Sequence, residues 1–146
     1  MTPRLVSFFE LNLGCCDPRR SIALPRQSPL GIYEHLSYRP TSAWPATCLC
    51  INCGRLFDNL EPDARFAQLE LPDQGLPLPD LWQFEFECDR QSCERLRDIY
   101  TTYEAGAPEA EVKNAVFRNI STIRCSAGHE FAVNDATLKR MERFPW

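Results

Sequence analysis

Cysteine and histidine side chains occur in this sequence at spacings that suit a metal ion. Cys125 and His129 are separated by three residues that include Gly128, so a tight turn can direct a thiolate and an imidazole at one point. Cys88 and Cys93 form another closely spaced pair upstream. Three thiolates and one imidazole are a ligand set typical of structural zinc. These four ligands are therefore the first candidate metal site.

A second group of cysteines lies in the first half of the chain. Cys50 and Cys53 are followed by Gly54, and a Cys-x-x-Cys-Gly turn is typical of metal binding. Two further ligands would come from three other cysteines, which are Cys15, Cys16 and Cys48. We therefore predict one or two Zn²⁺ ions per chain. The candidate ligands are Cys88, Cys93, Cys125, His129, Cys50, Cys53, Cys16, Cys15 and Cys48.

Other uses of these thiols stay open. A single sequential zinc ribbon could form from two pairs, Cys50 with Cys53 and Cys88 with Cys93, and His129 would then have no role. The thiols could instead pack in a β-rich core, because cysteine is among the most buried residue types. Cys50 and Cys53 could also carry out thiol redox chemistry, although that motif usually opens a helix.

The length and composition limit the architecture. A chain of 146 residues fits one ordinary domain or two very small ones, and very small domains need metal ions or disulfides to supplement the core. The N-terminus lacks a secretory pattern, and no apolar run approaches the ~18 residues of a membrane span. We therefore expect a cytoplasmic protein without membrane contact, whose cysteines bind metal in preference to forming disulfides.

The net charge of −4 bears on the choice of partner. Neutralisation of phosphates supplies most generic affinity for nucleic acids, so an acidic chain is a poor candidate for that role. A binding or adaptor module for another protein is the favoured function, and a nucleic-acid-binding ribbon is the alternative. We expect no enzymatic activity: Glu130 could act as a base beside a catalytic metal, but a complete set of four ligands leaves no open position. The sequence gives no indication of oligomeric state.

The patterns of apolar residues predict mostly strands. Alternation and β-branched content predict strands at residues 5–13, 21–24, 47–51, 65–71, 82–88, 99–103 and 122–125. A helix is predicted over residues 108–119, with Val112, Ala115 and Val116 on its apolar face. Asn134 or Asp135 is predicted to cap a last helix that carries Leu138 and Met141 inward.

The two halves of the chain can be aligned as a weak internal repeat. Each half has a strand, cysteines, a variable segment, and then a strand that leads into a ligand-bearing turn followed by Phe57 or Phe131. The predicted organisation is a first unit over residues 1–71, a linker over 72–80 and a second unit over 81–146. The fold class is α+β, with two zinc-ribbon-like units and one or two short helices.

The turns at residues 48–57 and 88–131 resemble those of zinc-ribbon and zinc-knuckle proteins. The layout of two such units is similar to that of uncharacterised small proteins from GC-rich bacteria. The resemblance implies a small β-rich fold with structural zinc. It implies no catalytic residue, because a fold shared by proteins of diverse roles does not determine function.

Overall fold

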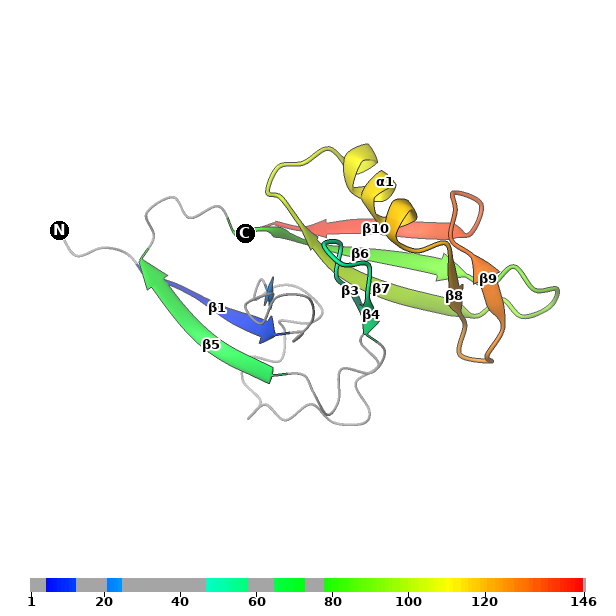
Figure 1. Cartoon of the computed structure of the whole chain (residues 1–146), viewed down its shortest axis with the longest axis horizontal. Helices are drawn as coiled ribbons and strands as arrows, with labels where there is room; N and C mark the ends of the chain where they lie inside the picture. Colours follow the sequence, from blue (N-terminus) through cyan, green and yellow to red (C-terminus); the bar gives the residue numbers. More distant parts are fainter. Residues whose placement is uncertain (1–4, 13–20, 25–46, 58–64, 73–77, 146) are drawn as a thin grey trace.

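Strands make up most of the described structure, together with one helix (Figure 1). This computed structural model describes residues 5–12, 21–24, 47–57, 65–72 and 78–145. The elements are β1 (Leu5–Asn12), β2 (Ser21–Leu24), β3 (Cys48–Leu49), β4 (Leu56–Phe57), β5 (Arg65–Pro72), β6 (Asp80–Glu87), β7 (Leu96–Tyr103), α1 (Glu109–Asn119), β8 (Thr122–Arg124), β9 (Glu130–Ala132) and β10 (Leu138–Phe144). This composition is consistent with the predicted α+β class.

The largest sheet has five strands in the order β10-β6-β7-β3-β4. β6 and β7 pair antiparallel over their whole lengths, from Asp80 opposite Tyr103 to Glu87 opposite Leu96. β10 pairs antiparallel with the other side of β6. The strands predicted at residues 82–88 and 99–103 are confirmed, and β7 extends further toward the N-terminus than predicted.

Alternate residues of β6 form the core together with α1. Side chains of a strand alternate between the two faces of its sheet, so Trp82, Phe84 and Phe86 share one face. The rings of Phe84 and Phe86 stack with centroids 6.3 Å apart. The helix contributes Val112 and Val116, which are fully buried in the same cluster. The predicted helix and its apolar face are therefore confirmed.

The hairpin of β8 and β9 is a separate two-stranded sheet that packs on this core. Ile123 of β8 lies opposite Phe131 of β9, and both side chains are buried. The amide of Val133 extends the hairpin by donating to the Ser121 carbonyl at 2.9 Å. The strand predicted at residues 122–125 is confirmed, while β9 was not predicted.

A second short hairpin, β3 and β4, joins the five-stranded sheet at β7. β3 runs parallel to β7, with Cys48 opposite Tyr100. The amide of Tyr100 donates to the Thr47 carbonyl at 2.8 Å, and the buried hydroxyl of Thr101 donates to the Leu49 carbonyl at 2.8 Å. A hairpin from the first predicted unit therefore shares a sheet with strands of the second.

The remaining strands form a three-stranded sheet in the order β2-β1-β5. β1 lies in the centre and pairs antiparallel with both neighbours. These three elements confirm the strands predicted at residues 5–13, 21–24 and 65–71.

The predicted C-terminal helix is wrong, because residues 138–144 form β10 instead. The sequence analysis interpreted the three-residue spacing of Leu138 and Met141 as helical. The strand puts both on one face because the pairing register shifts after Leu138, which lies opposite Phe86, while Met141 lies opposite Phe84. A β-bulge therefore produces the spacing of a helix within a strand.

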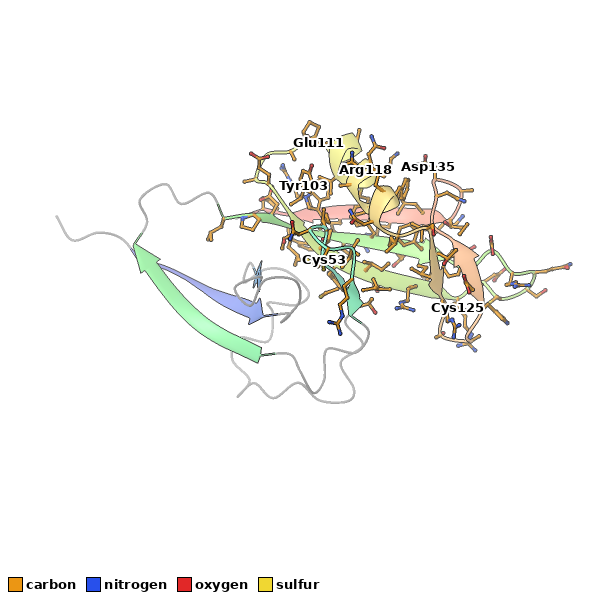
Figure 2. All side chains as sticks on the ribbon, in the orientation of Figure 1. Cys53, Tyr103, Glu111, Arg118, Cys125 and Asp135 are labelled. Carbon is orange, nitrogen blue, oxygen red and sulfur yellow. The ribbon has the colours of Figure 1, made fainter. Side chains whose placement is uncertain are left out.

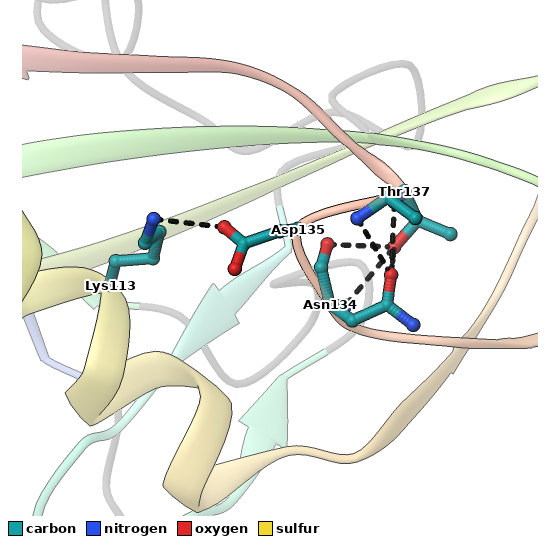
Figure 3. Close-up of polar contacts among 5 residues, drawn as sticks. Lys113, Asn134, Asp135 and Thr137 are labelled. Atoms are coloured by element: carbon teal, nitrogen blue, oxygen red, sulfur yellow. Dashed lines mark hydrogen bonds and ion pairs between the residues drawn. The ribbon is translucent and has the colours of Figure 1, made fainter.

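The predicted cap residues instead shape the turn before β10 (Figure 3). The side-chain oxygen of Asn134 accepts hydrogen bonds from the amides of Ala136 at 2.9 Å and Thr137 at 3.1 Å. The carboxylate of Asp135 forms an ion pair with Lys113 of α1, with its Oδ1 2.8 Å from Lys113 Nζ. The side chain of asparagine accepts hydrogen bonds from the amides that follow it both in such turns and at helix starts, so its presence alone does not predict a helix.

Candidate metal centre

Cys88 and Cys93 lie in the turn between β6 and β7. The amide of Cys88 donates to the Arg95 carbonyl at 2.8 Å, and that of Cys93 donates to the Arg90 carbonyl at 3.0 Å. Glu94, like Ser92 before it, has a positive φ, which is uncommon for residues other than glycine. The turn therefore depends on backbone conformations that its hydrogen bonds must hold in place.

The turn between β8 and β9 presents Cys125 and His129. The Cys125 amide donates to the His129 carbonyl at 2.9 Å, and the Gly128 amide donates to the Cys125 carbonyl at 2.9 Å. Gly128 has a φ of 86°, where a Cβ atom would be strained. The glycine thus allows the tight turn that the sequence analysis expected at this position.

These two turns place four potential ligand atoms together. The ligand atoms of Cys88, Cys93, Cys125 and His129 all lie within 4.8 Å of one another, so the group could hold a metal ion. His129 Nδ1 lies 3.9 Å from Cys88 Sγ and 3.3 Å from Cys93 Sγ. Cys93 Sγ lies 3.8 Å from Cys125 Sγ, far beyond the ~2.05 Å of a disulfide.

The distances match the edges of a tetrahedron around one ion. With metal–sulfur bonds of about 2.3 Å and metal–nitrogen bonds of about 2.0 Å, two sulfurs lie about 3.8 Å apart and sulfur and nitrogen about 3.5 Å apart. The sulfur–sulfur distance of 3.8 Å equals the first value. The two sulfur–nitrogen distances, 3.3 and 3.9 Å, lie on either side of the second. The other three distances are at most 4.8 Å, so movements of about 1 Å or less would bring all four atoms onto one ion.

The four ligands differ in their exposure to solvent. Cys88 and Cys125 are each 4% exposed and belong to the hydrophobic core, against which Cys93 packs. His129 is exposed at the surface. An ion bound here would join the core to the two surface turns.

The two buried thiols, Cys88 and Cys125, differ in pKa because of the hydrogen bonds that their sulfur atoms accept. Burial raises the pKa of Cys88 to about 11, although the Arg90 amide opposes the shift. Burial also acts to raise the pKa of Cys125, but the amides of His129 and Ala127, together with the neighbouring thiols, outweigh it and lower this pKa to about 7. The amides of His129 and Ala127 thus stabilise negative charge on the Cys125 sulfur.

Arginine side chains tie the two turns together at the surface. Arg95 donates to the hydroxyl of Ser126 at 3.2 Å, and Arg97 donates to the carbonyl of Arg124. The sequence analysis did not single out Arg97, because its contact with β8 joins two different sheets. Three thiolates and a neutral imidazole around a divalent cation leave one negative charge, which these guanidinium groups can offset.

The first-half cysteines are only partly described. Cys48 and Cys50 are buried and Cys53 is exposed, whereas Cys15 and Cys16 lie outside the described residues. Burial raises the pKa of Cys48 to about 12. Within the part of the chain that the structure describes, none of these residues belongs to a group of three or more potential metal ligands.

The alternative ribbon of Cys50 and Cys53 with Cys88 and Cys93 does not form among the described residues. The structure groups the latter pair with Cys125 and His129 instead. Figure 2 shows Cys53 and Cys125 at well-separated places, beside β3 and at the end of the β8–β9 hairpin. Residues 56–57 form β4, so the Cys50–Cys53 turn opens no helix of the redox type.

No described helix is both long enough and apolar enough to cross a membrane. Comparison of the chain with protein-family models, with curated proteins and with solved structures gives no match in any of the three. The chemistry of the four clustered ligands is therefore the basis for assigning a function.

Proposed function

We propose that Cys88, Cys93, Cys125 and His129 bind a structural Zn²⁺ ion. The observation that carries this proposal is the cluster of four N and S ligands with near-tetrahedral spacing. Thiolate and imidazole donors in this number favour zinc over calcium and magnesium, which prefer oxygen. The amides directed at the Cys125 sulfur support a thiolate there before any metal arrives.

A structural role suits this ligand set better than a catalytic one. Catalytic zinc usually keeps one position open for water or substrate, whereas four protein ligands fill a tetrahedral ion. The ion would join the β6–β7 turn to the β8–β9 turn across a gap of 32 residues between Cys93 and Cys125. Glu130, which follows His129, then has no metal-bound water to activate.

Two variants of neighbouring residues test the zinc site. His129→Ala removes one ligand, so zinc per chain should fall after dialysis against a competing chelator. Glu130→Ala changes the adjacent exposed residue of the same turn and should retain the zinc of the wild type. Equal retention of zinc by both variants would contradict the proposed ligand set. The readout is elemental analysis of the full chain purified without chelator.

We further propose that zinc-ribbon-like turns act as scaffold for a protein-binding surface. Leu96 is 50% exposed, and it begins β7 directly after the metal-binding turn. Two exposed arginines, Arg90 and Arg95, lie in that turn. Arginine and apolar side chains together are common in the centres of protein interfaces. The net charge of −4 favours a protein over a nucleic acid as the partner.

The adaptor role predicts partners that depend on Leu96. Leu96→Glu places a charge at an exposed position, so the variant should keep its zinc. It should no longer cross-link to the proteins of a cell extract that cross-link to the wild type. Lys139→Glu, at an exposed position of β10, is a matched control and should keep them. Capture of nucleic acid that weakens steeply with salt would instead support the nucleic-acid alternative. Partners unaffected by Leu96→Glu would contradict this surface.

A further inference from the structure

The β3–β4 hairpin has backbone hydrogen bonds like those of the β8–β9 hairpin, in a turn that is one residue longer. In β8–β9, the Cys125 amide donates across the turn to the His129 carbonyl, and the Gly128 amide donates back to the Cys125 carbonyl. In β3–β4, the Cys50 amide donates across the turn to the Arg55 carbonyl at 3.0 Å, and the Gly54 amide donates back to the Cys50 carbonyl at 2.7 Å. Each turn thus begins with a cysteine held in the same way.

The two glycines take the same unusual conformation. Gly54 has a φ of 75° and Gly128 a φ of 86°. A Cβ atom at Gly54 would also lie only 3.3 Å from the side-chain oxygen of Asn119. Both turns therefore favour glycine beside the second candidate ligand, where Gly54 follows Cys53 and Gly128 precedes His129.

The burial of the candidate ligands is also the same in the two turns. Cys50 is 2% exposed and Cys125 is 4% exposed, so the first ligand of each turn points inward. Cys53 and His129, the second ligands, are both exposed. An inner thiol and an outer ligand on one tight turn are also the arrangement proposed to bind zinc in the second half.

The strands around each turn follow one order. The first half has the sheet β2-β1-β5, and the second half contains the corresponding order β7-β6-β10, each with its first strand in the centre. In each half the ligand-bearing hairpin comes between the second and the last of these strands. The connection between the first and second of these strands has the same length in both halves. It covers residues 13–20 in the first half, where Asn12 pairs with Ser21, and residues 88–95 in the second, where Glu87 pairs with Leu96.

We propose that the Cys50–Cys53 turn binds a second Zn²⁺ ion, separate from the first. Thiolates from this turn would supply two of its ligands, and Arg55, exposed beside the turn, would offset part of their negative charge. The proposal rests on the proposed function of the second half, because the likeness of the two turns supports it, but the two ions would bind at separate places (Figure 2). Cys48 lies in β3, outside the Cys50–Cys53 turn, and is not one of the two ligands proposed here.

Counting zinc in the full chain tests this proposal. The wild type should retain two zinc ions after dialysis against a competing chelator. Cys53→Ser alters an exposed side chain that the fold does not need for packing, and it should retain one. Cys48→Ala is the matched control and should retain two. The double variant Cys53→Ser/His129→Ala should retain none.

The possible counts distinguish this site from the first. One zinc that survives Cys53→Ser but not His129→Ala would overturn the second site and support the first. One zinc that survives His129→Ala but not Cys53→Ser would support the second site alone. A wild type without zinc would overturn both sites.

Alkylation of Cys53 gives an independent readout, because the side chain is exposed. A maleimide reagent, followed by mass spectrometry, should modify Cys53 slowly in the purified chain and rapidly after chelation, since a metal-bound thiolate is protected. The Glu130→Ala variant should show the same change. Modification at one rate before and after chelation would overturn the proposal.

Discussion

Removal of metal should release the β8–β9 hairpin from the core. The hairpin strands are only three residues long and form a sheet of their own. Their anchors are two core ligands of the proposed site, Cys88 and Cys125, and three buried apolar side chains, Ile123, Phe131 and Val133. Without an ion, the thiols no longer hold the two turns together, and opening is opposed by the apolar contacts and by the surface hydrogen bonds from Arg95 and Arg97.

The size of the effect follows from the buried side chains. Burial of one such side chain contributes about 1.5–3 kcal/mol, so an opened hairpin loses roughly 5–9 kcal/mol of packing. Ordering the backbone of residues 122–133 costs about 1–2 kcal/mol per residue, so this packing alone does not hold the metal-free hairpin closed. Structural zinc in small domains has an apparent binding free energy of about 10–16 kcal/mol, which is enough to hold the hairpin closed.

The assay compares the zinc-loaded and the chelator-treated chain in urea. With a slope of about 1–3 kcal/mol per molar urea, the loss should lower the midpoint by about 2 M or more. Hydrogen exchange should locate the change, with faster exchange at the amides of Cys125 and Val133. The reasoning is refuted if chelation removes the metal while the urea midpoint and the protection of these amides stay the same.

Substitutions at three further positions have expected outcomes. The pKa of Cys48 is raised to about 12 from an ordinary 9.0, so its neutral thiol stabilises the fold below pH 9 and this contribution is lost as pH rises toward 12. At pH 10.5 the loss is about 2 kcal/mol, and Cys48→Ala should remove that part of the alkaline decline in urea stability. Thr101→Val removes the donor to the buried Leu49 carbonyl and should cost about 1–3 kcal/mol in urea unfolding, whereas Thr101→Ser should cost less; equal losses would contradict the role of the hydroxyl. Gly128→Ala has space for its methyl group but a positive φ, so zinc-loaded protein should lose about 1–2 kcal/mol, and unchanged stability would show that the turn relaxes.

Local patterns predicted the parts of the fold that depend on a single element. Strict alternation identified β6, because one of its faces packs in the core, and the spacing of Val112 and Val116 identified the inner face of α1. The same reasoning failed at residues 138–144, where a β-bulge gave a strand the spacing of a helix. A bulge depends on the partner strand, so it has no signature within the segment itself.

The candidate metal site was predicted from spacing, but its surroundings were not. Cys125 and His129 share one turn, so their sequence separation carries the information. The parallel pairing of β3 with β7 joins residues about 50 positions apart, and no local pattern specifies such a contact. The contact from Arg97 to the Arg124 carbonyl was not predicted for the same reason.

X-ray absorption at the zinc edge tests the central claim most directly. The Cys53→Ser variant leaves the second-half site as the only proposed site, so the spectrum reports one coordination shell. The four clustered ligands predict three sulfur atoms at about 2.3 Å and one nitrogen at about 2.0 Å. A shell of oxygen and nitrogen alone, or a protein without zinc, would contradict it.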